Sequence, residues 1–213
     1  MPSQPITRRR FLKIAGLSVA STTLAGAGLT VVATQTPTID HPTITLAGAT
    51  PMSKRILVAY ATRAGSTAEI AAAIAESLAT RGYAVDVQPV NAQPYLAGYT
   101  AAIIGSAVRI GNWLPEAIDF VKTNQVTLSG LPVALFTVHL RNTGDDEASR
   151  TARAAYLNAV QPLVPHAETV HFSGKMDFSR LSWLDRMIAK MAGAVESDER
   201  DWNKIRGWLP AGL

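Results

Sequence analysis

The stretch Tyr60-Ala61-Thr62-Arg63-Ala64-Gly65-Ser66-Thr67 decides the fold of this chain. It ends the apolar run 56–61, which lacks polar alternation and therefore predicts a strand buried on both faces. It is followed by apolar residues at helical spacing, which predict a helix capped by Ser66 or Thr67 and ended by Gly82. These apolar residues are Ile70, Ala71, Ile74, Ala75 and Leu78. The stretch is thus predicted to be the turn between a buried strand and a helix.

This turn also has the composition of an anion-binding site. Thr62, Ser66 and Thr67 supply three hydroxyl donors, and Gly65 permits backbone conformations that a side chain would block. The helix that begins behind the turn presents free N–H groups and the positive end of its dipole. A well-capped turn that binds no ligand would have the same composition, so the turn alone leaves both explanations open.

Several other ligand-binding turns are excluded by what the sequence lacks. The turn contains neither the Gly-x-Gly-x-x-Gly pattern of dinucleotide sites nor the Gly-Lys-Ser/Thr pattern of nucleoside triphosphate sites. Receiver domains need acidic residues around the first strand, and none occurs between Lys54 and Glu69. Low-molecular-weight phosphatases need a cysteine in this turn, and the chain has no cysteine.

Strand and helix patterns alternate along the rest of the chain. Strands are predicted at 56–61, 85–90, 101–106, 131–138 and 169–174, and helices at 66–82, 115–123, 150–163, 181–192 and 199–209. Such alternation predicts an α/β fold with a parallel sheet and helices on both faces. Five strands suit a doubly wound sheet of order 2-1-3-4-5, which binds ligands at the carboxyl ends of its strands.

Composition restricts the chemistry further. The lack of cysteine excludes disulfides, thiolate metal sites, iron–sulfur clusters and cysteine nucleophiles. His166 and His171 have no ligand-like spacing with His139, so no metal site is expected. From Lys54 onward, 16 Lys and Arg residues stand against 15 Asp and Glu residues. No basic stripe with interleaved aromatic residues is present, which argues against nucleic acid binding.

The N-terminus has the organisation of an export signal. Arg8-Arg9-Arg10-Phe11-Leu12-Lys13 precedes a moderately apolar run and resembles the twin-arginine (Tat) signal, which implies export of the folded protein out of the cytoplasm. Residues 1–33 are therefore assigned to this signal, 34–53 to a linker and 54–213 to the domain. Residues 12–33 are also long enough to span a bilayer, so a cleaved signal and a retained membrane anchor both stay open.

From residue 54 to about residue 139, the chain resembles the flavodoxins. The stretch 60–67 resembles their FMN phosphate loop, and residues 106–113 and 137–142 resemble the two loops that cover the isoalloxazine ring. The resemblance implies noncovalent binding of FMN. The implied phosphate-loop residues are Thr62, Arg63, Ala64, Gly65, Ser66 and Thr67. The implied ring-loop residues are Ser106, Ala107, Val108, Arg109, Ile110, Gly111, Asn112, Trp113, Thr137, Val138, His139, Leu140, Arg141 and Asn142.

A narrower resemblance is to the menaquinone-dependent protoporphyrinogen oxidases within this fold. It rests on Thr62-Arg63-x-Gly65, on the loop from Ser106 to Gly111 and, more loosely, on the segment from Gly174 to Met191. It implies an oxidoreductase that passes electrons through FMN to a quinone or another membrane carrier. The alternatives are an exported flavodoxin-type electron carrier with a protein redox partner, and a flavin-free binding protein.

Four ring-loop residues are candidates for particular roles. Trp113 either contacts the flavin or covers the start of the next helix. Arg109 is a candidate to stabilise a reduced, anionic ring, and Gly111 to permit a peptide flip near the ring. His139 is a candidate to donate to the ring or move a proton, with a structural histidine as the alternative.

The segment 178–191 combines apolar residues near helical spacing with the cations Arg180, Arg186 and Lys190. The apolar set is Phe178, Leu181, Trp183, Leu184, Met187, Ile188 and Met191. Such a segment either docks on a membrane surface or packs on the sheet with its cations reaching solvent. Residues 12–33 and residues 178–191 are therefore the two candidate segments for membrane association, and the alternatives stay open for both.

Overall fold

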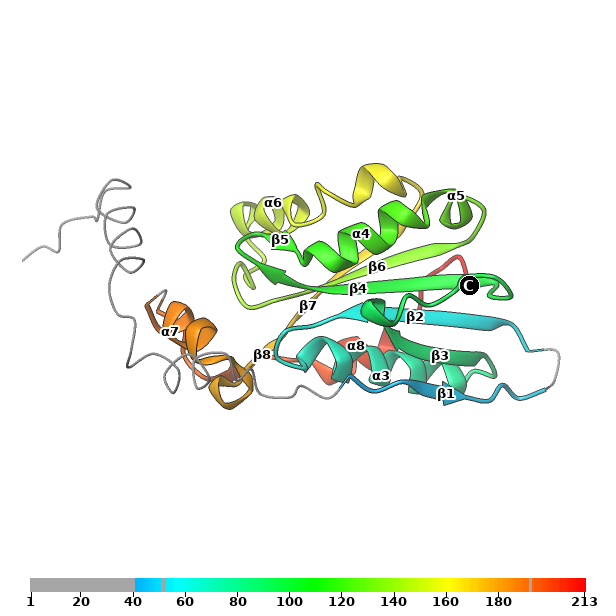
Figure 1. Cartoon of the computed structure of the whole chain (residues 1–213), viewed down its shortest axis with the longest axis horizontal. Coiled ribbons are helices and arrows are strands. Elements are labelled where there is room, and N and C mark those ends of the chain that lie inside the picture. Colours follow the sequence, from blue (N-terminus) through cyan, green and yellow to red (C-terminus); the bar gives the residue numbers. More distant parts are fainter. Residues whose placement is uncertain (1–40, 51–52, 192) are drawn as a thin grey trace, which may run out of the picture.

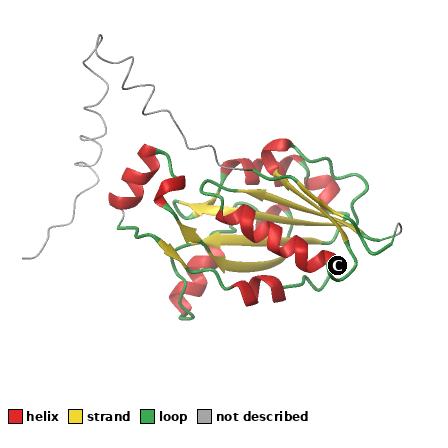
Figure 2. Ribbon diagram, turned by 90° about the horizontal axis from the view of Figure 1, so that it is seen from below, coloured by secondary structure: helices red, strands yellow, loops and turns green. Residues whose placement is uncertain are grey.

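A computed structural model describes residues 41–50, 53–191 and 193–213 as a central sheet between two layers of helices (Figures 1 and 2). The predicted export signal at 1–33 and the first part of the predicted linker lie outside these residues. The strands are β1 (Ile44–Leu46), β2 (Arg55–Ala61), β3 (Ala84–Pro89), β4 (Ala101–Arg109), β5 (Asn112–Trp113), β6 (Val133–His139), β7 (Glu168–Ser173), β8 (Lys175–Met176) and β9 (Ser197–Asp198). The helices are α3 (Ser66–Ala79), α4 (Pro115–Thr123), α5 (Gln125–Leu128), α6 (Glu147–Ala155), α7 (Trp183–Met191) and α8 (Trp202–Gly207).

The predicted strand order is confirmed. Five strands run parallel in the order β3-β2-β4-β6-β7, which is the order 2-1-3-4-5 for the five predicted strands. Helices α3 and α8 cover one face of this sheet, and α4 and α5 cover the other (Figure 1). The central strands β2, β4 and β6 are buried on both faces, as their continuous apolar sequence predicts.

Close packing at the centre of the sheet depends on one glycine. A Cβ atom at Gly105 in β4 would lie 1.9 Å from Cζ of Phe136 in β6. The fully buried phenyl ring therefore occupies the space that any side chain at position 105 would need.

Part of the predicted linker belongs to the sheet. Residues 44–46 form β1, which pairs antiparallel with β3, so assigning them to a linker was wrong. Ile44 and Leu46 pack against the core, and Thr45 Oγ1 donates a hydrogen bond of 2.7 Å to buried Asp86. Three residues are too short to give a clear period in the sequence, and this strand is held by contacts with distant residues.

Helix boundaries differ from the prediction where local hydrogen bonds decide them. Gly65, rather than Ser66 or Thr67, is the N-cap of α3. The helix predicted at 150–163 instead starts at Glu147, because Asp146 accepts from the N–H of Ser149. It ends at Ala155, where the N–H groups of Tyr156 and Leu157 donate to carbonyls three residues back instead of four. The last helix starts at Trp202 because Asp201 caps it. No helix within the described ranges is long and apolar enough to span a membrane.

Candidate functional site

A cavity of about 290 Å³ opens at the carboxyl ends of β2, β4 and β6. In the sheet, β3 lies on one side of β2, and β4, the next strand in the sequence, lies on the other side. The carboxyl end of β2 is therefore the point at which the strand order reverses. Eleven predicted site residues line the cavity: Thr62, Arg63, Ala64, Ser66, Ala107, Val108, Arg109, Ile110, Val138, His139 and Leu140. The three predicted loops, which lie far apart in the sequence, therefore meet around one cavity.

The loop from Thr62 to Thr67 has the geometry of an anion site. Gly65 adopts a left-handed conformation with φ of 87°, and its N–H donates a 3.0 Å hydrogen bond to Thr62 Oγ1. No side chain caps the start of α3, so its first N–H groups remain directed at the loop. Thr67 Oγ1 is buried and has no hydrogen-bond partner within the described structure. A buried hydroxyl without a partner is costly, and an anion held in this loop would satisfy it.

Arg63 connects this loop to α4. Its guanidinium donates two hydrogen bonds to Glu116, of 2.5 and 2.9 Å, in the bidentate geometry that favours arginine–carboxylate pairs. Glu116 lies in the first turn of α4, which directly follows the second predicted loop. The ion pair thus holds the first and second loops together at the mouth of the cavity.

The second loop is a tight hairpin between β4 and β5. Its two turn residues, Ile110 and Gly111, both have positive φ, as a two-residue hairpin turn requires. Ile110 is 87% exposed and lines the cavity, whereas Gly111 and Asn112 do not line it. Ser106 does not line the cavity either, and its hydroxyl accepts a hydrogen bond from the N–H of Leu114.

Trp113 lies in the core instead of on the cavity wall. Its side chain is 1% exposed, and Nε1 donates a 2.9 Å hydrogen bond to Thr137 Oγ1 in β6. The hydroxyl of Thr137 accepts this hydrogen bond, and Thr137 does not line the cavity either. Trp113 thereby fixes the second loop against the strand that carries the third loop.

The third loop brings His139 to the cavity. The imidazole is 4% exposed, and Nδ1–H donates a 2.7 Å hydrogen bond to the carbonyl oxygen of Arg141. Burial lowers the pKa of His139 despite that hydrogen bond, so the ring is neutral near pH 7. Arg141 and Asn142 lie outside the cavity, and Asn142 donates to the hydroxyl of Tyr156.

The remaining wall comes from residues that the sequence analysis did not assign to the site. Leu114 contributes from the start of α4, and Gly174, Lys175, Met176, Leu181 and Ala189 contribute from the segment after β7. We call residues 174–200 the strap. It places α7 beyond the carboxyl ends of the strands (Figure 1). The sequence could have indicated part of this wall. Residues 174–176 directly follow the fifth parallel strand, and all parallel strands end at this edge of the sheet.

The charges around the cavity favour an anionic ligand. Arg63, Arg109 and Lys175 line it, and none of the described Asp or Glu side chains does, although Glu116 pairs with Arg63 and Asp177 with Lys175 beside it. A Cβ atom at Gly174 would lie 2.9 Å from Val138 Cγ1 and 3.5 Å from Ser66 Oγ, so the strap begins against the anion loop. In the part of the chain that the structure describes, no three His, Asp or Glu side chains are grouped to hold a metal ion.

Comparison with known proteins identifies the family. The flavodoxin domain family matches residues 57–203, which include the whole cavity. The chain belongs to the flavodoxin domain family. Among curated members, it is similar to protoporphyrinogen IX dehydrogenase [quinone] of Escherichia coli K12, with 27% identity over 156 residues, 70% of this chain and 84% of the relative. It is similar to the protein of the same name from Leishmania major, with 29% identity over 159 residues, 71% of this chain and 68% of the relative.

Solved flavodoxin structures were also matched. Flavodoxin 2 of Bacillus cereus is 25% identical, with a TM-score of 0.40 over 56% of this chain and 84% of the flavodoxin. A Fusobacterium nucleatum flavodoxin bound to flavin mononucleotide is 15% identical, with a TM-score of 0.43 over 56% of this chain and 70% of the flavodoxin.

Proposed function

We propose that this flavodoxin-domain protein binds FMN in the cavity and acts as an oxidoreductase similar to protoporphyrinogen IX dehydrogenase, with a quinone as electron acceptor. The observation that carries the proposal is the meeting of the anion loop 62–67 with the loops 106–113 and 137–142 around one cavity. Family membership and the two named relatives support it.

The anion loop fits the phosphate of FMN. Thr62 and Ser66 line the cavity, and the unpartnered Thr67 hydroxyl lies in the first turn of α3 just behind them. Together with the N–H groups at the start of α3, they form a set of donors, and no described residue of the cavity wall adds a competing carboxylate. The loop would therefore hold the phosphate by hydrogen bonds and the helix dipole, while the Arg63–Glu116 ion pair fixes the loop at the mouth.

The apolar part of the cavity wall suits a flat aromatic ring system. It is formed by Val108, Leu114, Val138, Met176 and Leu181, which would keep water from the ring. Arg109 would supply positive charge toward a reduced ring, and His139 would present an unprotonated Nε2, because its Nδ1–H is held by the Arg141 carbonyl. FMN, when bound, supplies the electron-transfer chemistry; these residues orient it and keep water out.

The exposed face of the strap is the surface that would approach the quinone acceptor. Trp183, Met187 and Met191 of α7 are 59%, 40% and 75% exposed, and Lys190 lies on the same helix. Exposed aromatic and apolar side chains beside cations suit the interface of a membrane, where quinones reside. We infer that α7 approaches a membrane and that residues 1–33 direct export by the Tat route, with residues 12–33 as the anchor if the signal is retained.

The proposal is tested by purifying the full chain and recording its visible spectrum with and without added FMN. We expect a flavin spectrum, and oxidation of protoporphyrinogen IX when a menaquinone analogue is present. A colourless protein that takes up no FMN would refute flavin binding. Bound FMN without quinone-dependent oxidation would instead support the electron carrier with a protein partner.

A further inference from the structure

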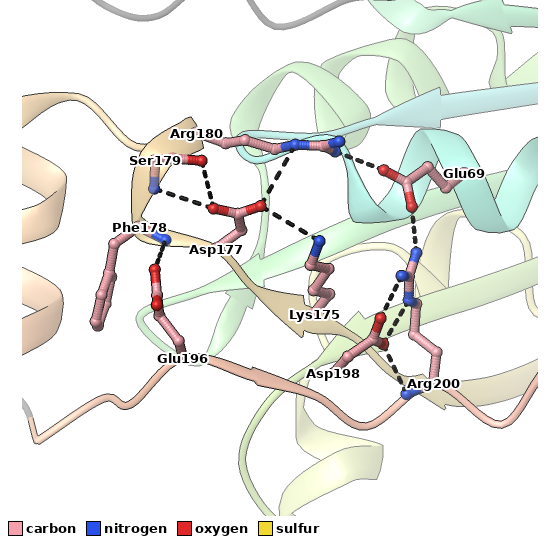
Figure 3. Close-up of polar contacts among 9 residues, drawn as sticks. All are labelled: Glu69, Lys175, Asp177, Phe178, Ser179, Arg180, Glu196, Asp198 and Arg200. Atoms are coloured by element: carbon pink, nitrogen blue, oxygen red, sulfur yellow. Dashed lines mark hydrogen bonds and ion pairs between the residues drawn. The ribbon is translucent and has the colours of Figure 1, made fainter.

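The strap is joined to the body of the protein by a connected set of charged side chains (Figure 3). Glu69 in α3 lies at its centre and forms ion pairs with Arg180 and Arg200. Arg200 also pairs with Asp198 through two hydrogen bonds of 2.5 and 2.7 Å. On the other side, Asp177 lies 3.3 Å from Lys175 Nζ and 3.7 Å from Arg180 Nε. One carboxylate of the body thus contacts cations from two separate parts of the strap.

The two ends of the strap are also held to each other and to the third loop. The N–H of Gly174 donates to the carbonyl of His139 at 2.9 Å, and the N–H of Glu199 donates to the carbonyl of Gly174 at 3.1 Å. Strands β8 and β9 pair antiparallel between these ends. The intervening residues, including α7, therefore form a closed loop whose base touches the cavity.

Glu69 is placed where it can couple the strap to the anion loop. It lies in the first turn of α3, two residues after Thr67. The side chain of Arg200 is only 6% exposed, so its pair with Glu69 is shielded from solvent on one side. Partial burial alone would raise the pKa of Glu69, but the hydrogen bonds from Arg200 and Arg180 outweigh it and hold that pKa below its usual value. The carboxylate is thus charged at neutral pH.

The alternative is that the network only adds to overall stability. Exposed ion pairs contribute little to stability, whereas a shielded pair that joins two segments chiefly slows their separation. The strap supplies Lys175, Met176, Leu181 and Ala189 to the cavity wall, so its separation would uncover the ligand.

We propose that Glu69 is a positioning residue that locks the strap over the cavity and thereby slows the release of FMN. This inference rests on the proposed function, because it requires FMN in the cavity. Glu69 itself lies outside the cavity wall. The strap is then a part of the binding site, and its closed position depends on the charge of Glu69.

The test compares the dissociation rate of FMN from the wild type, Glu69→Gln and Glu76→Gln, measured from the recovery of flavin fluorescence after dilution. Glu76 lies two turns further along α3, is exposed, and loses the same charge. We expect dissociation at least tenfold faster for Glu69→Gln and unchanged for Glu76→Gln, with thermal midpoints of the two apo variants close together. Unchanged dissociation for Glu69→Gln would overturn the proposal. A wild type that binds no FMN would refute the proposed function instead.

A second measurement reports the strap itself. Because the chain has no cysteine, spin labels placed by Met191→Cys on α7 and Val126→Cys on α5 are specific, and both sites are largely exposed. We expect a narrow distance distribution with Glu69 present and a broad one in Glu69→Gln; identical distributions would contradict the lock. If Glu69→Gln does not fold, Arg180→Gln, whose side chain is 42% exposed, is measured in the same two assays with the same expectations.

Discussion

The hydroxyl of Thr67 should affect the apo protein and the FMN complex in opposite directions. Thr67 is fully buried, and no described residue forms a hydrogen bond with its Oγ1. Replacing it with Val keeps the shape and the β-branch but removes the hydroxyl. An unsatisfied buried polar group costs about 1–3 kcal/mol, so we expect Thr67→Val to raise the free energy of unfolding of the apo protein within this range. A hydrogen bond to a charged phosphate contributes about 1.5–3 kcal/mol, so FMN affinity should fall roughly 10- to 150-fold.

Urea unfolding of the apo protein and a fluorescence titration with FMN measure the two effects separately. Thr151→Val makes the same chemical change at an exposed position of α6 and should alter stability by less than about 0.5 kcal/mol. Apo Thr67→Val that is less stable than wild type would show that the hydroxyl has a protein partner. Unchanged FMN affinity would show that the loop does not hold the phosphate in the way proposed.

Two further predictions concern packing and pH. Gly105→Ala should lower the free energy of unfolding by about 1–3 kcal/mol, because the added methyl group overlaps Phe136, and Phe136→Leu in the same chain should restore part of it in thermal melts. Burial, with the charge of His139, lowers the pKa of His171 from 6.5 to about 4. The folded state therefore resists protonation, and stability should fall as pH drops from about 6.5 toward 4. His171→Gln should flatten this fall in pH-dependent unfolding; an equal slope would contradict the assignment.

The parts of the fold that depend on local sequence were predicted well. The stretch 60–67 identified the turn, and the bounds predicted for the helix at 115–123 agree with α4, where Pro115 occupies the first turn. The strand order followed from the number and alternation of strands. The meeting of three loops at one cavity followed in turn, since the carboxyl ends of parallel strands share one edge of the sheet.

The features that sequence reasoning missed depend on contacts between distant residues. The position of Trp113 is decided by a hydrogen bond to Thr137 on another strand, which neither residue's neighbours reveal. Strands β8 and β9 pair although residues 177–196 separate them, and strands of two residues give no signal of such pairing in the sequence. The strap also divides the apolar residues of 178–191: Leu181 lines the cavity, while Trp183, Met187 and Met191 are exposed.

The short strand β1 has a consequence for how the molecule is oriented. Because β1 runs antiparallel to β3, Ile44 lies toward the carboxyl end of the sheet, and the hydroxyl of Tyr60 donates to the carbonyl of Pro42 beside the anion loop. Whatever precedes residue 41 is thus attached at the end that carries the cavity and α7. If the preceding residues were held in a bilayer, the chain would enter the folded domain from the same end as the cavity mouth.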